Sequence, residues 1–251
     1  MSLKKRGRLR NVLVVGATSS LAHALCNAIA RKGWNIILAG RDREELERTK
    51  SDLIIRHNIK AETCICDLAQ TDFYGEQLLN EAGSLGEIDT LFIVAGEMGD
   101  PKLRSDSEEI DRVIRVNFLS PIKILAAFAD KIEETRSGDI VVISSVAGDR
   151  GRQSNYTYGS AKGALSLYAA GLRNRLATKG CHVMTVKPGF VDTPMTYNLK
   201  SGLIAPRELV AGMIIDGLEK KRDILYTPPI WHLIMLIIRL IPESIFKKMK
   251  L

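Results

Sequence analysis

The chain lacks the residue spacings that build metal sites and disulfide frameworks. Its four cysteines, Cys26, Cys64, Cys66 and Cys181, contain no Cys-x-x-Cys pair, and its four histidines do not pair at metal-ligand spacing. We therefore expect no metal. Because Cys64 and Cys66 alternate along a predicted strand, they share one face and are expected to be buried free thiols. Free thiols favour a reducing compartment and hence a cytoplasmic protein.

Long apolar runs, internal repeats and low-complexity tracts are also missing. The apolar stretch near the N-terminus is a short predicted strand broken by Gly16, which does not fit a secretory signal. The most apolar stretch, residues 230–241, contains Arg239 and is shorter than the roughly 18 to 20 residues that cross a bilayer. With 251 residues, of which 45% are apolar, the chain is nevertheless able to form a sizeable core.

Acidic residues are absent from the N-terminal end, where five basic residues stand alone. The formal net charge of +7 comes from this end and from residues 230–251, so the middle of the chain is close to neutral. That distribution argues against a nucleic-acid partner, which requires a basic face on the folded body. It fits contact with an anionic lipid surface, or a solubilising tail. The N-terminal basic residues are Lys4, Lys5, Arg6, Arg8 and Arg10.

Short apolar runs alternate with amphipathic segments along most of the chain. This alternation predicts βαβ units and a doubly wound parallel sheet of about seven strands, a Rossmann fold, with an amphipathic helical extension at the C-terminus. We expect a basic tail over 1–10, an α/β domain over 11–228, and a C-terminal segment of the same domain over 229–251. Strands are predicted at 11–16, 36–39, 63–66, 88–94, 140–144, 183–187 and 224–226. Helices are predicted from the first strand to about 32 and at 42–57, 72–82, 107–134 (bent near Pro121), 155–179 and 206–220.

Polar residues and glycines follow the ends of several predicted strands, which is where ligands bind in such sheets. The loop Gly16 to Ala22 joins the first strand to a helix whose N-terminus suits a pyrophosphate, although a merely capped helix start is the alternative. Arg41 suits the 2′-phosphate of NADP(H), which we favour over NAD(H) despite the neighbouring Asp42. Asp67 is suited to accept a hydrogen bond from an adenine amino group, or to cap the next helix.

Three further side chains carry the chemistry. Ser145 follows the strand at 140–144, and Tyr158 and Lys162 are four residues apart, so on a helix they project from one face. A phenol beside an ammonium group, with a hydroxyl nearby, is able to deliver a proton to a carbonyl oxygen. The alternative is an ordinary exposed helix pair.

Taken with the glycine loop, these residues resemble the short-chain dehydrogenase/reductase family over about residues 11–200. The resemblance implies NAD(P)-dependent interconversion of a ketone and a secondary alcohol. It implies that Tyr158 is the general acid/base and that the positive charges of Lys162 and the oxidised nicotinamide favour the Tyr158 phenolate. It also implies that Lys162 holds the nicotinamide ribose, that Ser145 orients the substrate oxygen and that Asn117 holds a water. The cofactor residues that it implies are Gly16, Thr18, Ser19, Ser20, Leu21, Arg41, Asp67, Leu68, Ala95, Gly96, Tyr158, Lys162, Pro188, Gly189, Val191 and Thr193.

The chain departs from the family pattern at two places. Ser20 and Ala22 replace fingerprint glycines, and Ile93-Val94 precedes Ala95-Gly96 where the family has two asparagines. These departures affect the expected cofactor affinity more than the chemistry. They also leave the alternative that the chain is a non-catalytic nucleotide-sensing or scaffold protein.

Within the family, the loop 145–155 and the segment 241–248 resemble the bacterial reductases of decaprenylphosphoryl keto-pentose, which act in ribose-to-arabinose epimerisation. This likeness favours a keto-sugar or another lipid-linked carbonyl as substrate; a general ketone, 3-ketoacyl or steroid-like reductase is the alternative. Arg150, Arg152 and Gln153 lie in that loop, where two arginines are suited to bind a phosphate. A solvated basic loop is the alternative.

The C-terminal segment has two interpretations. Trp231 at one end and Lys247, Lys248 and Lys250 beyond the other fit a helix lying in the membrane interface, at the inner face of the membrane. The same apolar residues would equally pack on the core or on a neighbouring subunit. The family resemblance implies a homodimer or homotetramer.

Overall fold

Seven parallel strands form one sheet in the order β3-β2-β1-β4-β5-β6-β7. The structure, a computed structural model, describes residues 10–249 except 71, 73, 74, 198 and 200, so the basic residues at 4–8 lie outside the described part. The doubly wound fold predicted from the alternating pattern is confirmed. The strands are β1 Asn11–Val15, β2 Asn35–Gly40, β3 Ala61–Ile65, β4 Thr90–Ile93, β5 Asp139–Ile143, β6 His182–Pro188 and β7 Ile224–Thr227.

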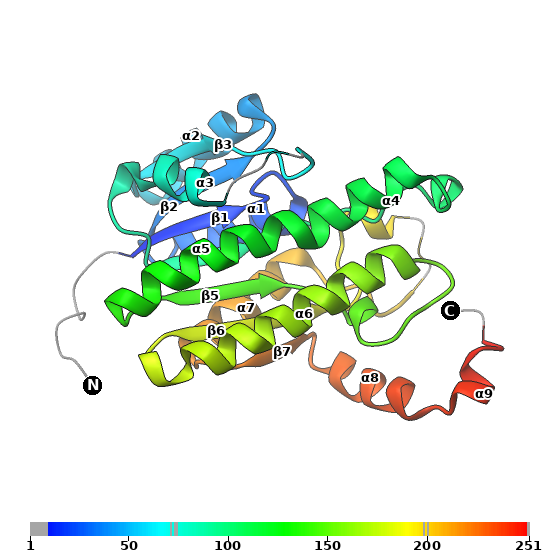
Figure 1. Ribbon diagram of the computed structural model, residues 1–251. Coiled ribbons are helices and arrows are strands. Elements are labelled where there is room, and N and C mark those ends of the chain that lie inside the picture. Colours follow the sequence, from blue (N-terminus) through cyan, green and yellow to red (C-terminus); the bar gives the residue numbers. More distant parts are fainter. Residues whose placement is uncertain (1–9, 71, 73–74, 198, 200, 250–251) are drawn as a thin grey trace.

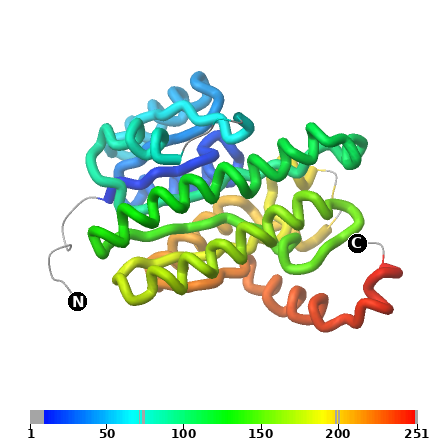
Figure 2. Tube along the Cα trace, in the orientation of Figure 1, coloured from blue at the N-terminus to red at the C-terminus, as the bar shows by residue number. Residues whose placement is uncertain are grey.

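Helices cover both faces of the sheet (Figures 1 and 2). Helices α1, α2 and α7 pack on one face, and α3, α5 and α6 pack on the other. The helices are α1 Ser20–Ala30, α2 Arg43–His57, α3 Gly75–Glu81, α4 Ser107–Ile114, α5 Ser120–Thr135, α6 Tyr156–Leu176, α7 Arg207–Glu219, α8 Ile230–Leu240 and α9 Glu243–Phe246.

Each buried strand contributes side chains to both cores. In β1, Val12 and Val14 join the core beneath α1 and α7, whereas Leu13 and Val15 join the core beneath α5 and α6. Successive side chains of a strand point to opposite faces, so a sheet covered on both sides needs continuous apolar strands. This requirement explains why the strands appear in the sequence as uninterrupted apolar runs.

The long helix predicted over 107–134 is divided into α4 and α5 by a π-helical segment, Arg115–Leu119. Pro121 follows this segment and has no N–H group, so it is unable to donate the usual bond to the carbonyl of Asn117. The predicted bend is therefore present, a few residues before Pro121. It leaves the Asn117 side chain fully buried, pointing toward the end of β4.

The C-terminal segment forms α8 and the short α9, which project past the carboxyl ends of the strands (Figure 1). Trp231 and Met235 of α8 are buried against Val146, so packing on the core is confirmed for one face of the helix. The opposite face keeps large apolar side chains exposed. They are Ile230, Leu233, Leu236, Ile237 and Leu240. Within the described residues, no helix has the length and apolar character to cross a membrane.

Candidate active site

Ser145, Tyr158 and Lys162 come together at the carboxyl end of β5. Ser145 follows β5, and Tyr158 and Lys162 lie in the first two turns of α6, both buried. The Lys162 ammonium donates hydrogen bonds to the carbonyls of Ala95 (2.9 Å) and Ile143 (3.1 Å). Its nitrogen lies 5.8 Å from the centre of the Tyr158 ring. An ammonium has three N–H donors, so two anchor Lys162 to the strand ends and the third is left for a bound hydroxyl.

Burial shifts the pKa values of this pair in opposite directions. It raises the pKa of Tyr158 to about 12, although a hydrogen bond with Ser145 pulls the value down. It lowers the pKa of Lys162 to about 7. Burial disfavours the charged form of each group, the phenolate and the ammonium. In the protein by itself, burial therefore dominates the pKa of Tyr158 and favours the protonated phenol.

Asn117 is fixed by the turn after β4. Its amide nitrogen donates to the carbonyls of Glu97 (2.7 Å) and Val113 (2.8 Å), and its oxygen accepts from the Glu97 N–H (3.1 Å). Gly96 lies between Asn117 and Lys162: a Cβ at this position would be 3.2 Å from the Lys162 nitrogen and 3.5 Å from the Asn117 oxygen. The Ala95-Gly96 turn thus brings Asn117 close to the ammonium group.

The glycine loop has the backbone that its sequence predicts. Gly16 has a φ of +82°, and a Cβ there would be 2.7 Å from the backbone nitrogen of Ala95, so only glycine fits. Ser19 is the N-cap of α1 and accepts from the Ala22 N–H at 3.2 Å. The capped-helix interpretation is therefore correct, and it is compatible with binding, since helix N-termini attract phosphate. Thr18 lies against Gly40, Ser20 begins α1, and Leu21 is buried behind the loop.

Arg41 and Asp42 have different roles at the end of β2. The Asp42 carboxylate accepts from the Glu45 N–H (3.0 Å) and caps α2, whereas the Arg41 side chain is exposed. Asp67 accepts from the Ala69 N–H (3.0 Å) in a turn after β3. The alternative that Asp67 caps the next helix is wrong, because α3 begins only at Gly75. The carbonyl of the buried Leu68 accepts from the Ser120 hydroxyl at 2.7 Å.

The segment after β6 is covered by a side chain that sequence reasoning did not place here. Trp231 of α8 lies so close to Gly189 that a Cβ on this glycine would be 1.8 Å from the indole nitrogen. Phe190 packs edge-on against the same indole, with ring centroids 4.9 Å apart. The only signal in the sequence is Gly189 itself, directly after β6, because its lack of a side chain leaves room for the indole. Pro188 ends β6, Val191 is buried, and the Thr193 hydroxyl donates to the Val191 carbonyl at 3.3 Å.

The two loop arginines do not form one phosphate site. Arg150 donates to the carbonyls of Ile238 and Ile241 (2.6 Å), and it pairs with Glu243 at 2.9 Å. It therefore binds the C-terminal end of α8, because the last carbonyls of a helix lack partners within the helix. Arg152 instead points at the sulfur of Met235, at 3.5 Å. The expectation that both arginines face a substrate is wrong for Arg150.

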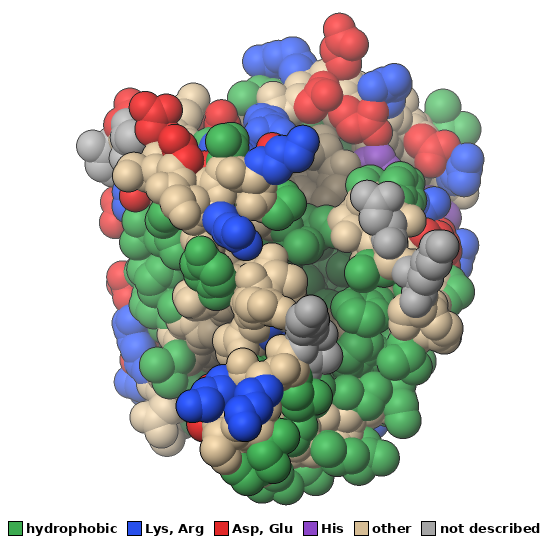
Figure 3. All heavy atoms as spheres, turned by 90° about the vertical axis from the view of Figure 1, so that its right-hand side faces the viewer, with side chains coloured by type: hydrophobic (Ala, Val, Ile, Leu, Met, Phe, Trp, Pro, Cys, Tyr) green, Lys and Arg blue, Asp and Glu red, His purple; other side chains and the backbone are tan. Residues whose placement is uncertain are grey.

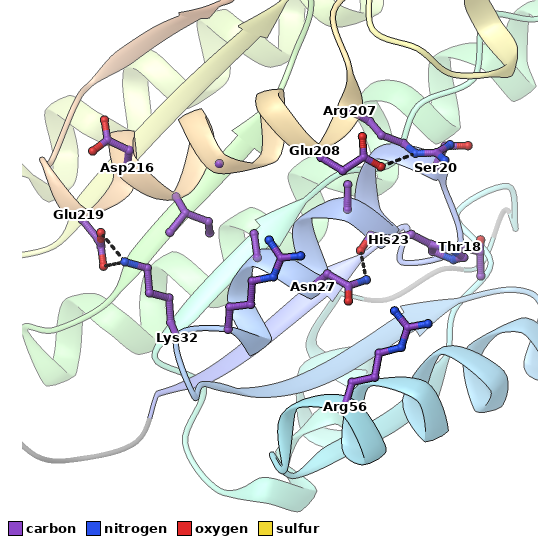
Figure 4. Close-up of a pocket in the computed structure, with 15 residues that line it drawn as sticks. Thr18, Ser20, His23, Asn27, Lys32, Arg56, Arg207, Glu208, Asp216 and Glu219 are labelled. Atoms are coloured by element: carbon purple, nitrogen blue, oxygen red, sulfur yellow. Dashed lines mark hydrogen bonds and ion pairs between the residues drawn. The ribbon is translucent and has the colours of Figure 1, made fainter.

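The carboxyl edge of the sheet is hollowed. Figure 3 shows a depression there lined mainly by hydrophobic side chains, with more of them gathered along the lower margin, at the height of α8. Beside Tyr158, a hollow of about 100 Å³ is bordered by residues 98–101, Glu109, Val113 and residues 153–157. A larger groove of about 680 Å³ lies elsewhere, between α1 and α7. In Figure 4 this groove touches the glycine loop only through Thr18 and Ser20, and Lys32 pairs with Glu219 at its far end, so we assign the chemistry to the smaller hollow.

These residues fit a nicotinamide dinucleotide. The tight turn at Gly16 and the start of α1 suit its pyrophosphate, and the third Lys162 donor suits a ribose hydroxyl. Gly16 lets the end of β1 abut the backbone of Ala95, and Gly96 leaves room for the Lys162 ammonium and the Asn117 oxygen. The site thus joins a nucleotide cradle to a buried phenol, which is the combination that carbonyl reduction needs.

Comparison with known proteins agrees with this geometry. Residues 10–203 match the family model for short chain dehydrogenase. An uncharacterized oxidoreductase of Streptomyces coelicolor is 29% identical over 247 residues, 97% of each chain. The structure is similar to that of a short-chain dehydrogenase from Sphingobium yanoikuyae in complex with NADPH, with a TM-score of 0.81 and 22% identity over 90% of this chain and 92% of that one. It is also similar to an NAD⁺-bound xylitol dehydrogenase, with a TM-score of 0.75 and 21% identity over 87% of this chain and 97% of that one. Because the family model covers most of its length, the chain belongs to the short-chain dehydrogenase family and is an oxidoreductase.

Proposed function

We propose that the protein interconverts a ketone and a secondary alcohol, with Ser145, Tyr158, Lys162 and Asn117 as its catalytic site. One observation carries this proposal: the buried Tyr158 phenol is hydrogen bonded with Ser145 and lies beside the Lys162 ammonium. A nicotinamide dinucleotide, when bound, supplies or accepts the hydride. The chain itself holds the carbonyl oxygen and moves the proton.

The proton steps follow from the pKa values. With a pKa of about 12, Tyr158 carries its proton at neutral pH and is ready to give it to a carbonyl oxygen during reduction. Ser145 donates to the same oxygen and orients it. Lys162 and Asn117 replace the proton: the ammonium stabilises the phenolate as it forms, and a water held at Asn117 connects Lys162 to solvent.

The decisive experiment is Tyr158→Phe, measured as dinucleotide oxidation with a panel of ketones. Because the ring is kept and only the hydroxyl is lost, we expect kcat to fall by about 10²- to 10⁴-fold, the usual contribution of a positioned acid. Tyr168→Phe, a change of another tyrosine on α6, is the matched control. Wild-type turnover by the Tyr158 variant would refute the assignment.

We propose a keto-sugar or another lipid-linked carbonyl as the substrate. The resemblance of the loop 145–155 supports this class, and so does an apolar helix, α8, packed beside Ser145 through Val146. A general ketone, 3-ketoacyl or steroid-like reductase is the second candidate, which the hydrophobic lining in Figure 3 favours. Turnover of simple bulky ketones at rates above those of keto-sugars would select the second.

We propose NADP(H) as the preferred cofactor. Asp42 is occupied as the cap of α2, which leaves Arg41 as the exposed charged side chain at the end of β2. A guanidinium at this position attracts a 2′-phosphate and gives nothing comparable to a ribose hydroxyl.

We also propose a cytoplasmic homodimer or homotetramer that touches the inner face of the membrane through α8. Five large apolar side chains are exposed on this helix, from Ile230 to Leu240, and Arg239, Lys247 and Lys248 add positive charge beside them. Apolar faces with basic neighbours partition into anionic interfaces.

A further inference from the structure

The wall between the catalytic site and α8 contains two buried N–H donors that have no acceptor. They are Arg152 Nε and Trp231 Nε1, and neither has a hydrogen-bond partner among the described residues. Buried donors in folded proteins are nearly always satisfied, and one left unpaired costs about 1–3 kcal/mol. Two such donors in one wall indicate a ligand that supplies the missing oxygens.

The two donors are held beside the catalytic serine. Arg152 reaches the sulfur of Met235 at 3.5 Å, and Met235 lies one helical turn from Trp231. Met235 and Trp231 pack against Val146, which directly follows Ser145 in the chain. On its other side, the Trp231 indole nitrogen faces Gly189. Both donors therefore adjoin the cluster of Val146, Trp231 and Met235 that follows Ser145.

Arg152 also lacks a counter-ion. No carboxylate lies within ion-pair distance of it in the described part of the chain. Burial lowers the pKa of Arg152, and the charge of Asp149 raises it. The Asp149 carboxylate has other partners: it pairs with Lys187 and accepts a hydrogen bond from the Tyr226 hydroxyl at 2.7 Å. Arg150, two residues away, has partners at the end of α8 and on α9. A partly buried guanidinium without an anion is costly unless a ligand completes it.

From this arrangement we infer that Arg152 and Trp231 form a subsite for an anionic oxygen group, a phosphate ester or a carboxylate, on the carbonyl substrate. The guanidinium pairs with the charge, and the indole N–H donates to one of its oxygens. The inference rests on the proposed function for its substrate, and it narrows that substrate to carbonyl compounds carrying an acid group. It also gives the two arginines different roles: Arg150 holds α8 in place, and Arg152 binds the anionic group of the substrate.

The first test measures binding without turnover. The chain has two tryptophans, so Trp34→Phe leaves Trp231 as the sole indole reporter. We expect inorganic phosphate or acetate, titrated at constant ionic strength, to change the Trp231 fluorescence saturably. The response should disappear when Arg152→Gln is added. It should persist with Arg239→Gln, which removes an exposed positive charge from α8, the helix that carries Trp231. Equal responses with and without Arg152, or no response to either anion, would overturn the inference.

The second test is kinetic and distinguishes a phosphate ester from a carboxylate as the anionic group of the substrate. A keto-sugar phosphate is compared with the free keto-sugar, and a 2-oxo acid with its amide. Arg152→Gln should raise the KM of the acidic member of one pair about tenfold more than that of its neutral member, and Arg152→Lys should recover part of the loss. The pair that responds identifies phosphate or carboxylate. If no ketone is reduced but the fluorescence response depends on Arg152, the proposed reaction fails and the anion subsite stands.

Discussion

The two sides of the site are built differently. On the cofactor side, the ends of β1, β2 and β4 meet through the backbone: the N–H groups of Gly16 (2.9 Å) and Ala17 (3.0 Å) donate to the Ala39 carbonyl, and Gly16 abuts the backbone of Ala95. On the other side, α8 is attached through side chains, with Trp231 on Gly189 and Arg150 on the helix end. Backbone hydrogen bonds form whatever the side chains are, whereas a single substitution removes a side-chain contact. The comparison teaches that, in the proposed function, the sheet supports the cofactor and the more easily altered α8 borders the substrate.

Lys162→Met should produce the largest effect, because it removes the ammonium that is bonded to the carbonyls of Ala95 and Ile143 and lies beside Tyr158. We expect kcat to fall about a hundredfold or more, as when a preorganised donor is removed. A stability measurement adds a sharper signature. The unfolded lysine holds its proton up to a pKa of 10.5, and the folded one only up to about 7. The unfolded chain therefore binds more protons above pH 7, and the free energy of unfolding should rise with pH.

The rise should approach about 1.4 kcal/mol per pH unit and be absent in Lys162→Met. Chemical denaturation between pH 7 and 8 measures it, a range in which unfolded thiols, with a pKa of 9.0, keep most of their protons. Parallel pH profiles for the two proteins would contradict the lowered pKa of Lys162.

Gly189→Ala tests how α8 is attached. A methyl group at this position meets the Trp231 indole, so we expect a loss of about 1–3 kcal/mol in the free energy of unfolding, the usual cost of overpacking. The same change made in a Trp231→Leu background should cost only a few tenths of a kcal/mol, because the clash has been removed. An unchanged cost in that double-mutant cycle would mean that α8 does not rest on Gly189.

Leu240→Glu tests the outer face of α8. Leu240 is 74% exposed, and Leu167 on α6 is exposed to 76%, so Leu167→Glu is a matched control. We expect Leu240→Glu to weaken binding to phosphatidylglycerol vesicles about tenfold, since it removes apolar area and adds a repelled charge. Co-sedimentation measures the change. Equal weakening by both variants would show that general charge, and not α8, controls the contact.

Arg41→Ser should have the smallest effect and concerns the cofactor side alone. Losing the guanidinium should raise the KM for NADPH about fivefold relative to that for NADH, because only NADPH carries the 2′-phosphate. Steady-state kinetics with both cofactors gives the ratio. Arg43→Ser, two residues along, is the control; an unaltered ratio for Arg41→Ser would remove the support for NADP(H).

Much of the fold follows directly from the sequence. Strands such as β1 and β5 are continuous apolar runs because both faces of the sheet are covered, and the turn at Gly16 needs a conformation that glycine adopts easily. The spacing of Tyr158 and Lys162 places them on one helix face. Local patterns of this kind depend only on neighbours in the chain.

Contacts between distant residues were not predictable in the same way. Nothing near Arg150 and Arg152 in the chain tells them apart; their partners lie more than 80 residues away, on α8 and α9. The direction of the Tyr158 pKa depends on how deeply the folded chain buries the phenol, which the motif does not encode. Trp231 fits a membrane anchor by sequence, yet it is buried at the site.

The sequence by itself determined the parallel sheet, the glycine turn and the choice of the proposed reacting groups, because these rest on periodicity and on the chemistry of single residues. Only the tertiary structure decided which arginine holds α8, which one has no carboxylate partner among the described residues, and what covers Gly189. The physical reason is that burial and unsatisfied hydrogen bonds are properties of packed elements: they arise when β5, β6 and α8 meet, and they have no trace in any one segment.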